Sequence, residues 1–146
     1  MIHVPESGVT YFAQAGKGAF RKGARGKPQA IAVSRERKKL SVIVSRSHAG
    51  GEVEKLLKAF GPFQSVSAGS ALKFCRVAEG RAQLYPRFWP SMEWDTAAGD
   101  CLVEAAGGTV RDLNGKVLQY NKPNLENPYF VASAFGPDFW LKHLSR

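Results

Sequence analysis

Residues 93–108 constrain the fold of this chain more than any other stretch, and they read E-W-D-T-A-A-G-D-C-L-V-E-A-A-G-G. Small and apolar residues recur there at helical spacing and acidic residues occupy another face, so the pattern predicts an amphipathic helix over residues 95–106. Gly107 and Gly108 supply a left-handed C-cap that ends it. Because its side chains are small, we expect the helix to pack close to its neighbours and to hold its first residues at a fixed point.

Asp95 stands at the predicted start of this helix. Its carboxylate can accept hydrogen bonds from the backbone N–H groups two and three residues on, and its negative charge suits the positive end of the helix. Spacing alone favours this plain capping role, because capping Asp residues are common. The alternative is that the closely packed helix positions the carboxylate to bind a metal ion.

Strands and helices alternate after residue 40, which predicts an α/β layer structure over residues 41–146. Residues 1–40 are typical instead of β-hairpins from a neighbouring sheet, joined by glycine-rich turns. The patterns predict strands over residues 10–14, 30–33, 41–45, 65–68, 81–85, 109–112 and 129–132, and helices over residues 51–60, 70–78, 95–106 and 137–144. A chain of 146 residues is long enough to bury an ordinary core.

The net charge of +9 is distributed unevenly along the chain. Residues 1–46 hold ten Lys or Arg residues against Glu6 and Glu36, whereas the remainder is close to neutral. The basic residues gather in two runs, 17–27 and 35–39. Such runs can bind nucleic acid or steer a polyanionic substrate, but they are usually solvated turns, so we expect no nucleic-acid partner.

Cys75 and Cys101 both fall on predicted helices among apolar neighbours, without the C-x-x-C spacing of a metal or redox motif. We therefore predict reduced core thiols in a cytoplasmic protein that is at most peripheral at the inner membrane. No apolar stretch in the sequence is long enough for a signal peptide or a transmembrane segment.

Four motifs in order along the chain carry a family resemblance. They are S-R-S-H at residues 45–48, G-S-A-L-K-F-C at 69–75, V-A-E-G-R-A-Q-L-Y-P-R-F at 77–88 and W-D-T-A-A-G-D at 94–100. Together they resemble the inositol monophosphatase-like family of magnesium-dependent phosphatases, and most of all its bacterial 3'(2'),5'-bisphosphate nucleotidase branch. The resemblance covers nearly the whole chain but only the C-terminal half of that enzyme. It implies the C-terminal α/β layered portion of the inositol monophosphatase-like fold over residues 41–146, preceded by strands of the N-terminal domain's sheet over residues 1–40.

The resemblance also implies roles for five residues. Asp95 would bind Mg²⁺ and contact the substrate, and Ser70 and Lys73 would contact the nucleotide. Arg87, in the predicted loop Y-P-R-F-W-P, suits bidentate recognition of a phosphate. His48 would pack against or hydrogen-bond the base or ribose. The aromatic residues Phe88, Trp89 and Trp94 are expected to pack beneath the site.

Lys73 is unusual on physical grounds as well. Ser70 is a natural N-cap for the predicted helix over residues 70–78, and Lys73 then places a cation in the first turn. The helix dipole disfavours that cation by about 0.3–1 kcal/mol, unless an anion binds there. A phosphate at this helix end would accept hydrogen bonds from the Ser70 hydroxyl, from free backbone N–H groups and from the Lys73 ammonium. A lysine that faces solvent is the alternative.

Most metal ligands of the family are missing from the sequence. The upstream Glu and the D-P-x-D-G-T motif do not occur, and Mg²⁺ bound through Asp95 alone would be held weakly. Because a two-metal displacement cannot be assembled from one carboxylate, we expect half an active site. The parent reaction would be hydrolysis of the 3'-phosphate of adenosine 3',5'-bisphosphate. It would require the missing N-terminal half as a partner, as expected for a split gene product, a misassigned start or a deliberately shortened chain.

Two other functions stay open at this point. One is a non-catalytic domain that still binds adenosine bisphosphates, and the other is a relative that acts on inositol or sugar phosphates, which the motifs at residues 45–48 and 69–75 disfavour. The loss of half of a two-domain enzyme would expose an apolar interface and unpaired sheet edges. We therefore also predict aggregation or a homodimer.

Overall fold

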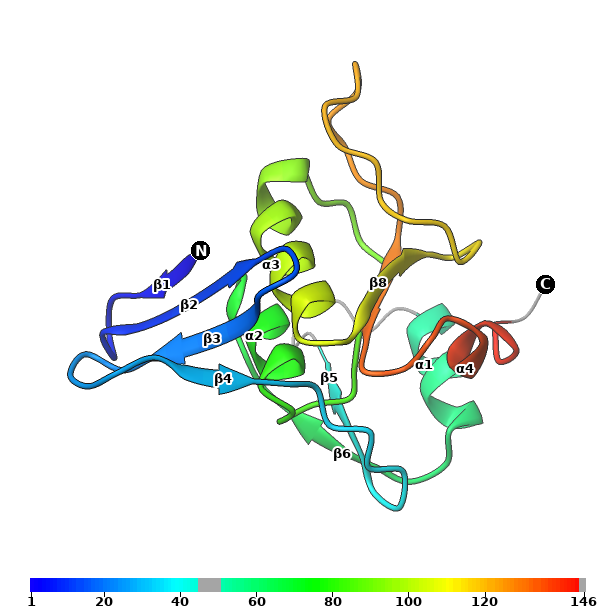
Figure 1. Ribbon diagram of the computed structural model, residues 1–146. Coiled ribbons are helices and arrows are strands. Elements are labelled where there is room, and N and C mark those ends of the chain that lie inside the picture. The colour runs from blue at the N-terminus through cyan, green and yellow to red at the C-terminus, as the bar shows by residue number, and fades with distance from the viewer. Residues whose placement is uncertain (45–50, 145–146) are drawn as a thin grey trace.

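The computed structural model describes residues 1–44 and 51–144, which form a four-stranded sheet, a five-stranded sheet and helices packed on both faces of the latter. The strands are β1 (Ile2–Val4), β2 (Val9–Gln14), β3 (Gly18–Lys22), β4 (Gln29–Ile31), β5 (Leu40–Ile43), β6 (Phe63–Val66), β7 (Leu84–Arg87), β8 (Thr109–Asp112) and β9 (Phe130–Ser133). The helices are α1 (Gly51–Ala59), α2 (Leu72–Ala78), α3 (Glu93–Ala105) and α4 (Asp138–Leu141). Figure 1 shows their arrangement.

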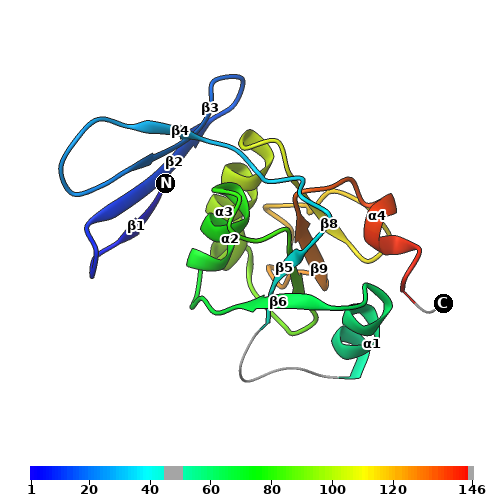
Figure 2. The ribbon, with the colours of Figure 1, turned by 90° about the horizontal axis from the view of Figure 1, so that it is seen from below.

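The layers follow one another in the order first sheet, α2 with α3, second sheet, α1 with α4 (Figure 2). The first sheet is an antiparallel meander in the order β1-β2-β3-β4, and the second is a mixed sheet in the order β6-β5-β7-β9-β8. Neighbouring residues of β5 show why both faces of the second sheet are covered: Val42 packs with the cluster beneath α1 and α4, and Ile43 packs with the cluster beneath α2 and α3. The predicted α/β layer structure is confirmed.

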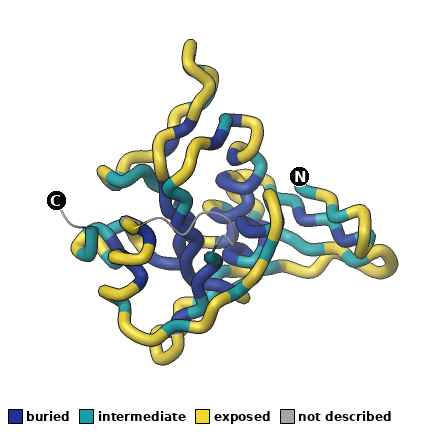
Figure 3. The backbone as a smooth tube through the Cα atoms, turned by 180° about the vertical axis from the view of Figure 1, so that it is seen from behind, coloured by how far each residue is buried: buried dark blue, intermediate teal, exposed yellow. Residues whose placement is uncertain are grey.

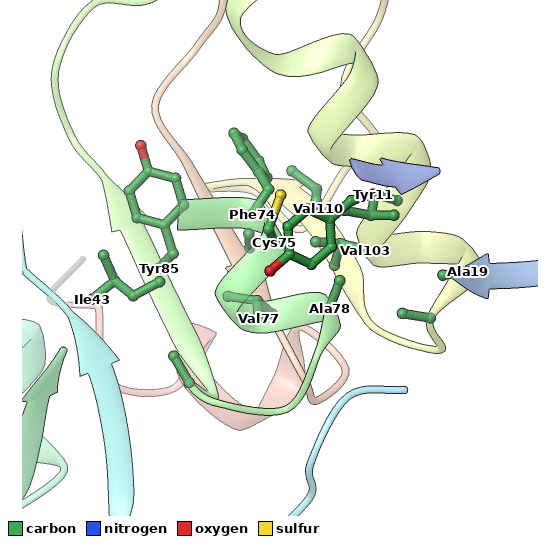
Figure 4. Packing of buried hydrophobic residues seen from close by; sticks show 14 of the residues in the cluster. Tyr11, Ala19, Ile43, Phe74, Cys75, Val77, Ala78, Tyr85, Val103 and Val110 are labelled. Carbon is green, nitrogen blue, oxygen red and sulfur yellow. The ribbon is translucent and has the colours of Figure 1, made fainter. Parts of the chain in front are cut away.

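The buried residues are concentrated in the second sheet and its helices, whereas the first sheet and the connection after β8 carry more exposed residues (Figure 3). The side chains between α2, α3 and the second sheet form the central cluster in Figure 4. Three aromatic rings pack together there: Phe74 meets Tyr85 edge-on at 5.3 Å and stacks on Phe130 at 5.8 Å, measured between ring centres. This packing holds α2 and α3 against the second sheet.

Several element boundaries differ from the sequence predictions. β1 and β3 were not predicted, because β1 is only three residues long and β3 contains a glycine and two cations. β7 begins and ends later than the predicted strand over residues 81–85 and runs through Pro86, which pairs with Val131 of β9. The parallel ladder to β5 joins Val42 to Leu84, so the proline lies beyond it and its missing N–H is tolerated.

Glu79, at the end of α2, links that helix to the first sheet. Its carboxylate, of which only 6% is exposed, accepts a hydrogen bond from the Tyr11 hydroxyl of β2 at 3.0 Å. It also pairs with Arg76 at 2.5 Å, and with Arg81 and Arg21 at 3.4 and 3.6 Å. Burial raises the pKa of Tyr11, so its hydroxyl stays protonated and donates this bond at neutral pH. The E-G-R segment of the third motif therefore attaches the first sheet to α2.

The second basic run is partly structural rather than a solvated turn. Arg35 donates hydrogen bonds to the backbone oxygens of Ala134 and Gly107, at 3.3 and 3.1 Å. The guanidinium carbon of Arg37 lies 5.2 Å from the centre of the Phe135 ring, within the range of a cation–π contact. These contacts attach the segment between β4 and β5 to the second sheet.

The two cysteines lie in different environments. Cys75 is fully buried, as predicted, and burial raises the pKa of its thiol to about 12. Cys101 is exposed on α3, so the prediction of a core thiol is wrong there. No helix within residues 1–44 and 51–144 is long and apolar enough to cross a bilayer.

Candidate functional site

A pocket of about 190 Å³ lies between α2, β7 and the start of α3. It is lined by Ser70, Ala71, Lys73, Phe74, Tyr85, Arg87, Ser91, Asp95, Thr96 and Phe130. Ser70, Lys73, Arg87 and Asp95, four of the five residues predicted from the sequence, thus meet in one place. The fifth, His48, lies outside the described residues.

Lys73 is a buried cation on the pocket wall. Only 9% of the residue is exposed, and its Nζ lies 5.5 Å from the centre of the Tyr85 ring. Within the described part of the chain, no carboxylate lies in ion-pair range of its ammonium. Burial lowers the pKa of Lys73, and the nearby Arg87 lowers it further. The predicted alternative of a lysine that faces solvent is therefore wrong, and the ammonium would gain from an anion in the pocket.

Ser70 is not the helix N-cap that the sequence predicts. α2 begins at Leu72, with Ala71 at the N-cap position and no side-chain capping bond. The backbone N–H groups of Leu72 and Lys73 donate to the oxygens of Gly69 and Ser70, so the free donors expected for a phosphate are already used. Ser70 itself has a φ of 43°, in the left-handed region that a serine rarely adopts. This tight turn places Ser70 on the pocket wall.

Arg87 is the last residue of β7 rather than part of a loop. Its Nη2 donates a hydrogen bond to the backbone oxygen of Pro90 at 3.1 Å, which holds the guanidinium against the segment that leads into α3. Its neighbour Tyr85 is buried, and burial raises the pKa of that phenol, so Tyr85 stays neutral. Among the described residues that line the pocket, Lys73 and Arg87 are the two cations.

Asp95 lies in the first turn of α3 but is not its N-cap. The helix begins two residues earlier, at Glu93, and Met92 occupies the N-cap position. The Met92 N–H donates to Oδ2 of Asp95 at 3.0 Å, which is the reciprocal half of a capping box. Among the described residues no donor contacts the other oxygen, Oδ1, which is therefore available to a ligand.

Gly99 explains why α2 and α3 lie so close together. A Cβ atom at this position would lie 2.3 Å from Cγ of Phe74, far inside van der Waals contact. Only glycine therefore permits the observed packing, and this packing brings Lys73 of α2 and Asp95 of α3 to the same pocket. The glycine of W-D-T-A-A-G has a structural role that composition alone does not reveal.

Sequence analysis missed three residues around the start of α3, namely Glu93, Thr96 and Asn127, all of them buried. The signal that could have identified Glu93 is its acidic side chain directly before W-D, which suits the positive end of the helix.

The aromatic prediction is wrong for two residues. Trp94 is 66% exposed and Trp89 is 50% exposed, so neither packs fully beneath the site.

The carboxylate oxygens of the pocket can supply part of a magnesium site but not a complete one. Asp95 is the only carboxylate among the pocket-lining residues, and no group of three or more His, Cys, Asp or Glu side chains suited to a metal occurs within the described ranges. Mg²⁺ commonly binds through one or two carboxylates and completes its shell with water and substrate phosphate. One carboxylate oxygen beside two cations is compatible with that arrangement.

Comparisons with known proteins show which family the chain resembles in sequence and fold. The sequence profile of the inositol monophosphatase family matches residues 1–143. The chain is 44% identical over 136 residues to the 3'(2'),5'-bisphosphate nucleotidase CysQ of Escherichia coli K12, covering 92% of this chain and 54% of that protein. The crystal structure of CysQ from Bacteroides thetaiotaomicron superposes with a TM-score of 0.80 at 36% identity, over 90% of this chain and 55% of that one.

The chain spans about half the length of the curated relatives it matches. A more distant structure, the 2'AMP-bound SaIMPase-II of Staphylococcus aureus, shares the fold with a TM-score of 0.72 at 19% identity, over 94% of this chain and 54% of that one. The profile match over nearly the whole chain and the identity to CysQ settle the relationship. The chain belongs to the inositol monophosphatase family.

Proposed function

We propose that this chain supplies the phosphate-binding wall and one metal-binding carboxylate of a magnesium-dependent phosphomonoesterase. Its substrate would be adenosine 3',5'-bisphosphate, and its products AMP and phosphate. The observation that carries the proposal is the convergence of Lys73 and Arg87 with Asp95 in one pocket. The substrate class follows from the nucleotidase activity named for the CysQ relatives.

Each residue has a distinct part in this proposal. Arg87 presents a planar guanidinium fork that matches two phosphate oxygens, and Lys73 adds a point charge. The Ser70 hydroxyl donates a further hydrogen bond, and His48 contacts the base or ribose. Because Lys73 is buried without a counter-ion among the described residues, an anion that enters the pocket regains Coulomb energy in a poorly screened environment.

Asp95 is the residue that would hold Mg²⁺. When bound, such an ion lowers the pKa of an attacking water and neutralises charge on the phosphoryl oxygens. Asp95 contributes to this through Oδ1, since Oδ2 already accepts the Met92 N–H. The cations of the wall meanwhile orient the phosphate that is not cleaved, so the two parts of the pocket act on different groups of the substrate.

Catalysis would need carboxylates beyond those of the pocket. We propose that they come from a segment equivalent to the part of the relatives that this chain does not match, and that the chain by itself binds without turnover. Asp95 is the single carboxylate among the described residues that line the pocket, which also favours a second candidate, a non-catalytic domain that binds adenosine bisphosphates. The predicted homodimer and the cytoplasmic location stay predictions.

Titration calorimetry of the chain with adenosine 3',5'-bisphosphate tests the proposal. We expect binding that Mg²⁺ strengthens and that Lys73→Met weakens. Lys58→Met, which removes an exposed cation from α1, is the matched control and should leave the affinity unchanged. No heat of binding at millimolar nucleotide would overturn the proposal. Inositol phosphate as competitor distinguishes the substrate classes, and a chimaera with the unmatched residues of Escherichia coli CysQ distinguishes an enzyme from a binding domain.

A further inference from the structure

The connection between β8 and β9, residues 113–129, here called the strap, runs past the first turn of α3 (Figure 1). Backbone hydrogen bonds join the two segments: the Glu93 N–H donates to the oxygen of Leu125 at 2.9 Å, and the Asn127 N–H donates to the oxygen of Ser91 at 2.8 Å. Met92 and Glu126 form an antiparallel bridge between them. The strap therefore pairs with the residues that lead into α3.

The Glu93 side chain is the strongest attachment point. It is 8% exposed, and its carboxylate accepts hydrogen bonds from the Asn121 N–H at 2.7 Å and the Lys122 N–H at 3.2 Å. The Lys122 ammonium pairs with the same carboxylate at 2.5 Å and also donates to the oxygen of Gln119 at 2.7 Å. Glu93 does not line the pocket, so these bonds hold the backbone rather than a ligand.

A second attachment lies on the other side of Asp95. The Thr96 hydroxyl donates to the backbone oxygen of Glu93 at 3.2 Å and accepts a hydrogen bond from Nδ2 of Asn127 at 3.0 Å. Thr96 is 1% exposed and Asn127 is 4% exposed, so water competes little for these bonds. Glu93 and Thr96, on either side of Asp95 in the chain, are thus both bound to the strap.

We infer that Glu93 is a positioning residue for Asp95: through Lys122 and the backbone of the strap it fixes the first turn of α3, and with it the direction of the Asp95 carboxylate. The inference rests on the proposed function, because it assigns Asp95 to a metal ion. Residues that orient a metal ligand without touching the metal typically change metal affinity by 10–100-fold when they are replaced. Glu93 is such a residue, because it would orient Asp95 without touching the metal ion.

Calorimetry with adenosine 3',5'-bisphosphate, in excess Mg²⁺ and in a chelator, separates positioning from stability. Glu93→Ala should reduce the gain in affinity that Mg²⁺ brings by about tenfold, while the affinity in chelator, which depends on Lys73 and Arg87, is unchanged. Glu93→Gln keeps one acceptor oxygen for the strap N–H groups and should restore part of the gain. Amide hydrogen exchange of Met92, whose N–H binds Asp95, should accelerate in Glu93→Ala.

Glu104→Ala is the matched control, because Glu104 also lies on α3, pairs with Arg111 and accepts a backbone N–H from Val110. It should lower stability without changing the magnesium-dependent gain. A gain that Glu93→Ala retains in full would overturn this inference and leave the proposed function intact. A wild-type chain that binds the nucleotide with no magnesium-dependent gain would overturn the inference together with the metal role of Asp95.

Discussion

The two walls of the pocket are held in place by different means. On the α2 wall, Lys73 is buried without a carboxylate partner among the described residues, and Ser70 adopts a left-handed conformation. On the α3 wall, the neighbours of Asp95 are bound to the strap by several hydrogen bonds and an ion pair. The cationic wall therefore lowers the free energy of unfolding, and a bound anion would offset this loss. The carboxylate wall is arranged by bonds that exist without any ligand.

Gly99→Ala should have the largest effect, because it forces the two walls apart. The added methyl group would lie 2.3 Å from the Phe74 ring, and overpacking of this kind typically costs about 1–3 kcal/mol. Urea unfolding should show this loss, and nucleotide binding should weaken as well. Gly136→Ala is the control, since nothing lies within 4 Å of its Cβ position. A wild-type midpoint for Gly99→Ala would show that α2 and α3 can separate without cost.

Lys73→Met should affect binding and stability in opposite directions. Loss of a charge-assisted contact to phosphate costs about 1.5–3 kcal/mol, or roughly 10–100-fold in affinity. Removal of a buried, unpaired cation should at the same time raise the free energy of unfolding. Calorimetry and urea unfolding of the same sample measure the two effects. A variant that binds more weakly and is also less stable would contradict the inference that the buried ammonium of Lys73 lowers the stability of the fold.

The pH dependence of stability should distinguish the walls by the pH range in which it occurs, with the smallest effect of the three. The Lys122 side chain and the strap N–H groups hold the pKa of Glu93 below its usual value, so the stability it contributes is present above that value and is lost as pH falls through the lowered pKa. Lys122→Met should remove part of this acid-sensitive stability. Urea midpoints measured across the acid range test this prediction. Midpoints of the variant and the wild type that change with pH in parallel would contradict a stabilising role of the Glu93–Lys122 ion pair.

Lys73 should show the same sign of pH dependence, but in the alkaline range. Because its pKa is lowered in the folded state, the free energy of unfolding should fall as pH drops from the usual lysine value of 10.5 through the lowered pKa. The difference in stability between Lys73→Met and wild type should grow over the same range. Saturating phosphate should reduce that difference, since a bound anion favours the charged ammonium.

The site residues were predictable because each stands in a motif that resembles a known family. Arg87, Ser70, Lys73 and Asp95 stand inside short motifs whose chemistry suits phosphate and metal, and all four line the pocket. Their local conformations were less predictable. Asp95 was assigned to the N-cap because the sequence of the first turn does not show that Glu93 is bound to a strap residue 29 positions away. The motifs thus identified Asp95, but not the contacts of Glu93 that hold the first turn of α3.

The amino-acid sequence by itself determined the α/β layering, through its periodicity, and four residues of the pocket, through motifs that resemble a known family. Only the tertiary structure decided which cations lack partners, which glycine permits two helices to touch and which acid orients Asp95. These depend on contacts between segments far apart in the sequence, such as Phe74 with Gly99 and Glu93 with Lys122. Burial and hydrogen bonding across such distances arise only when the chain has folded.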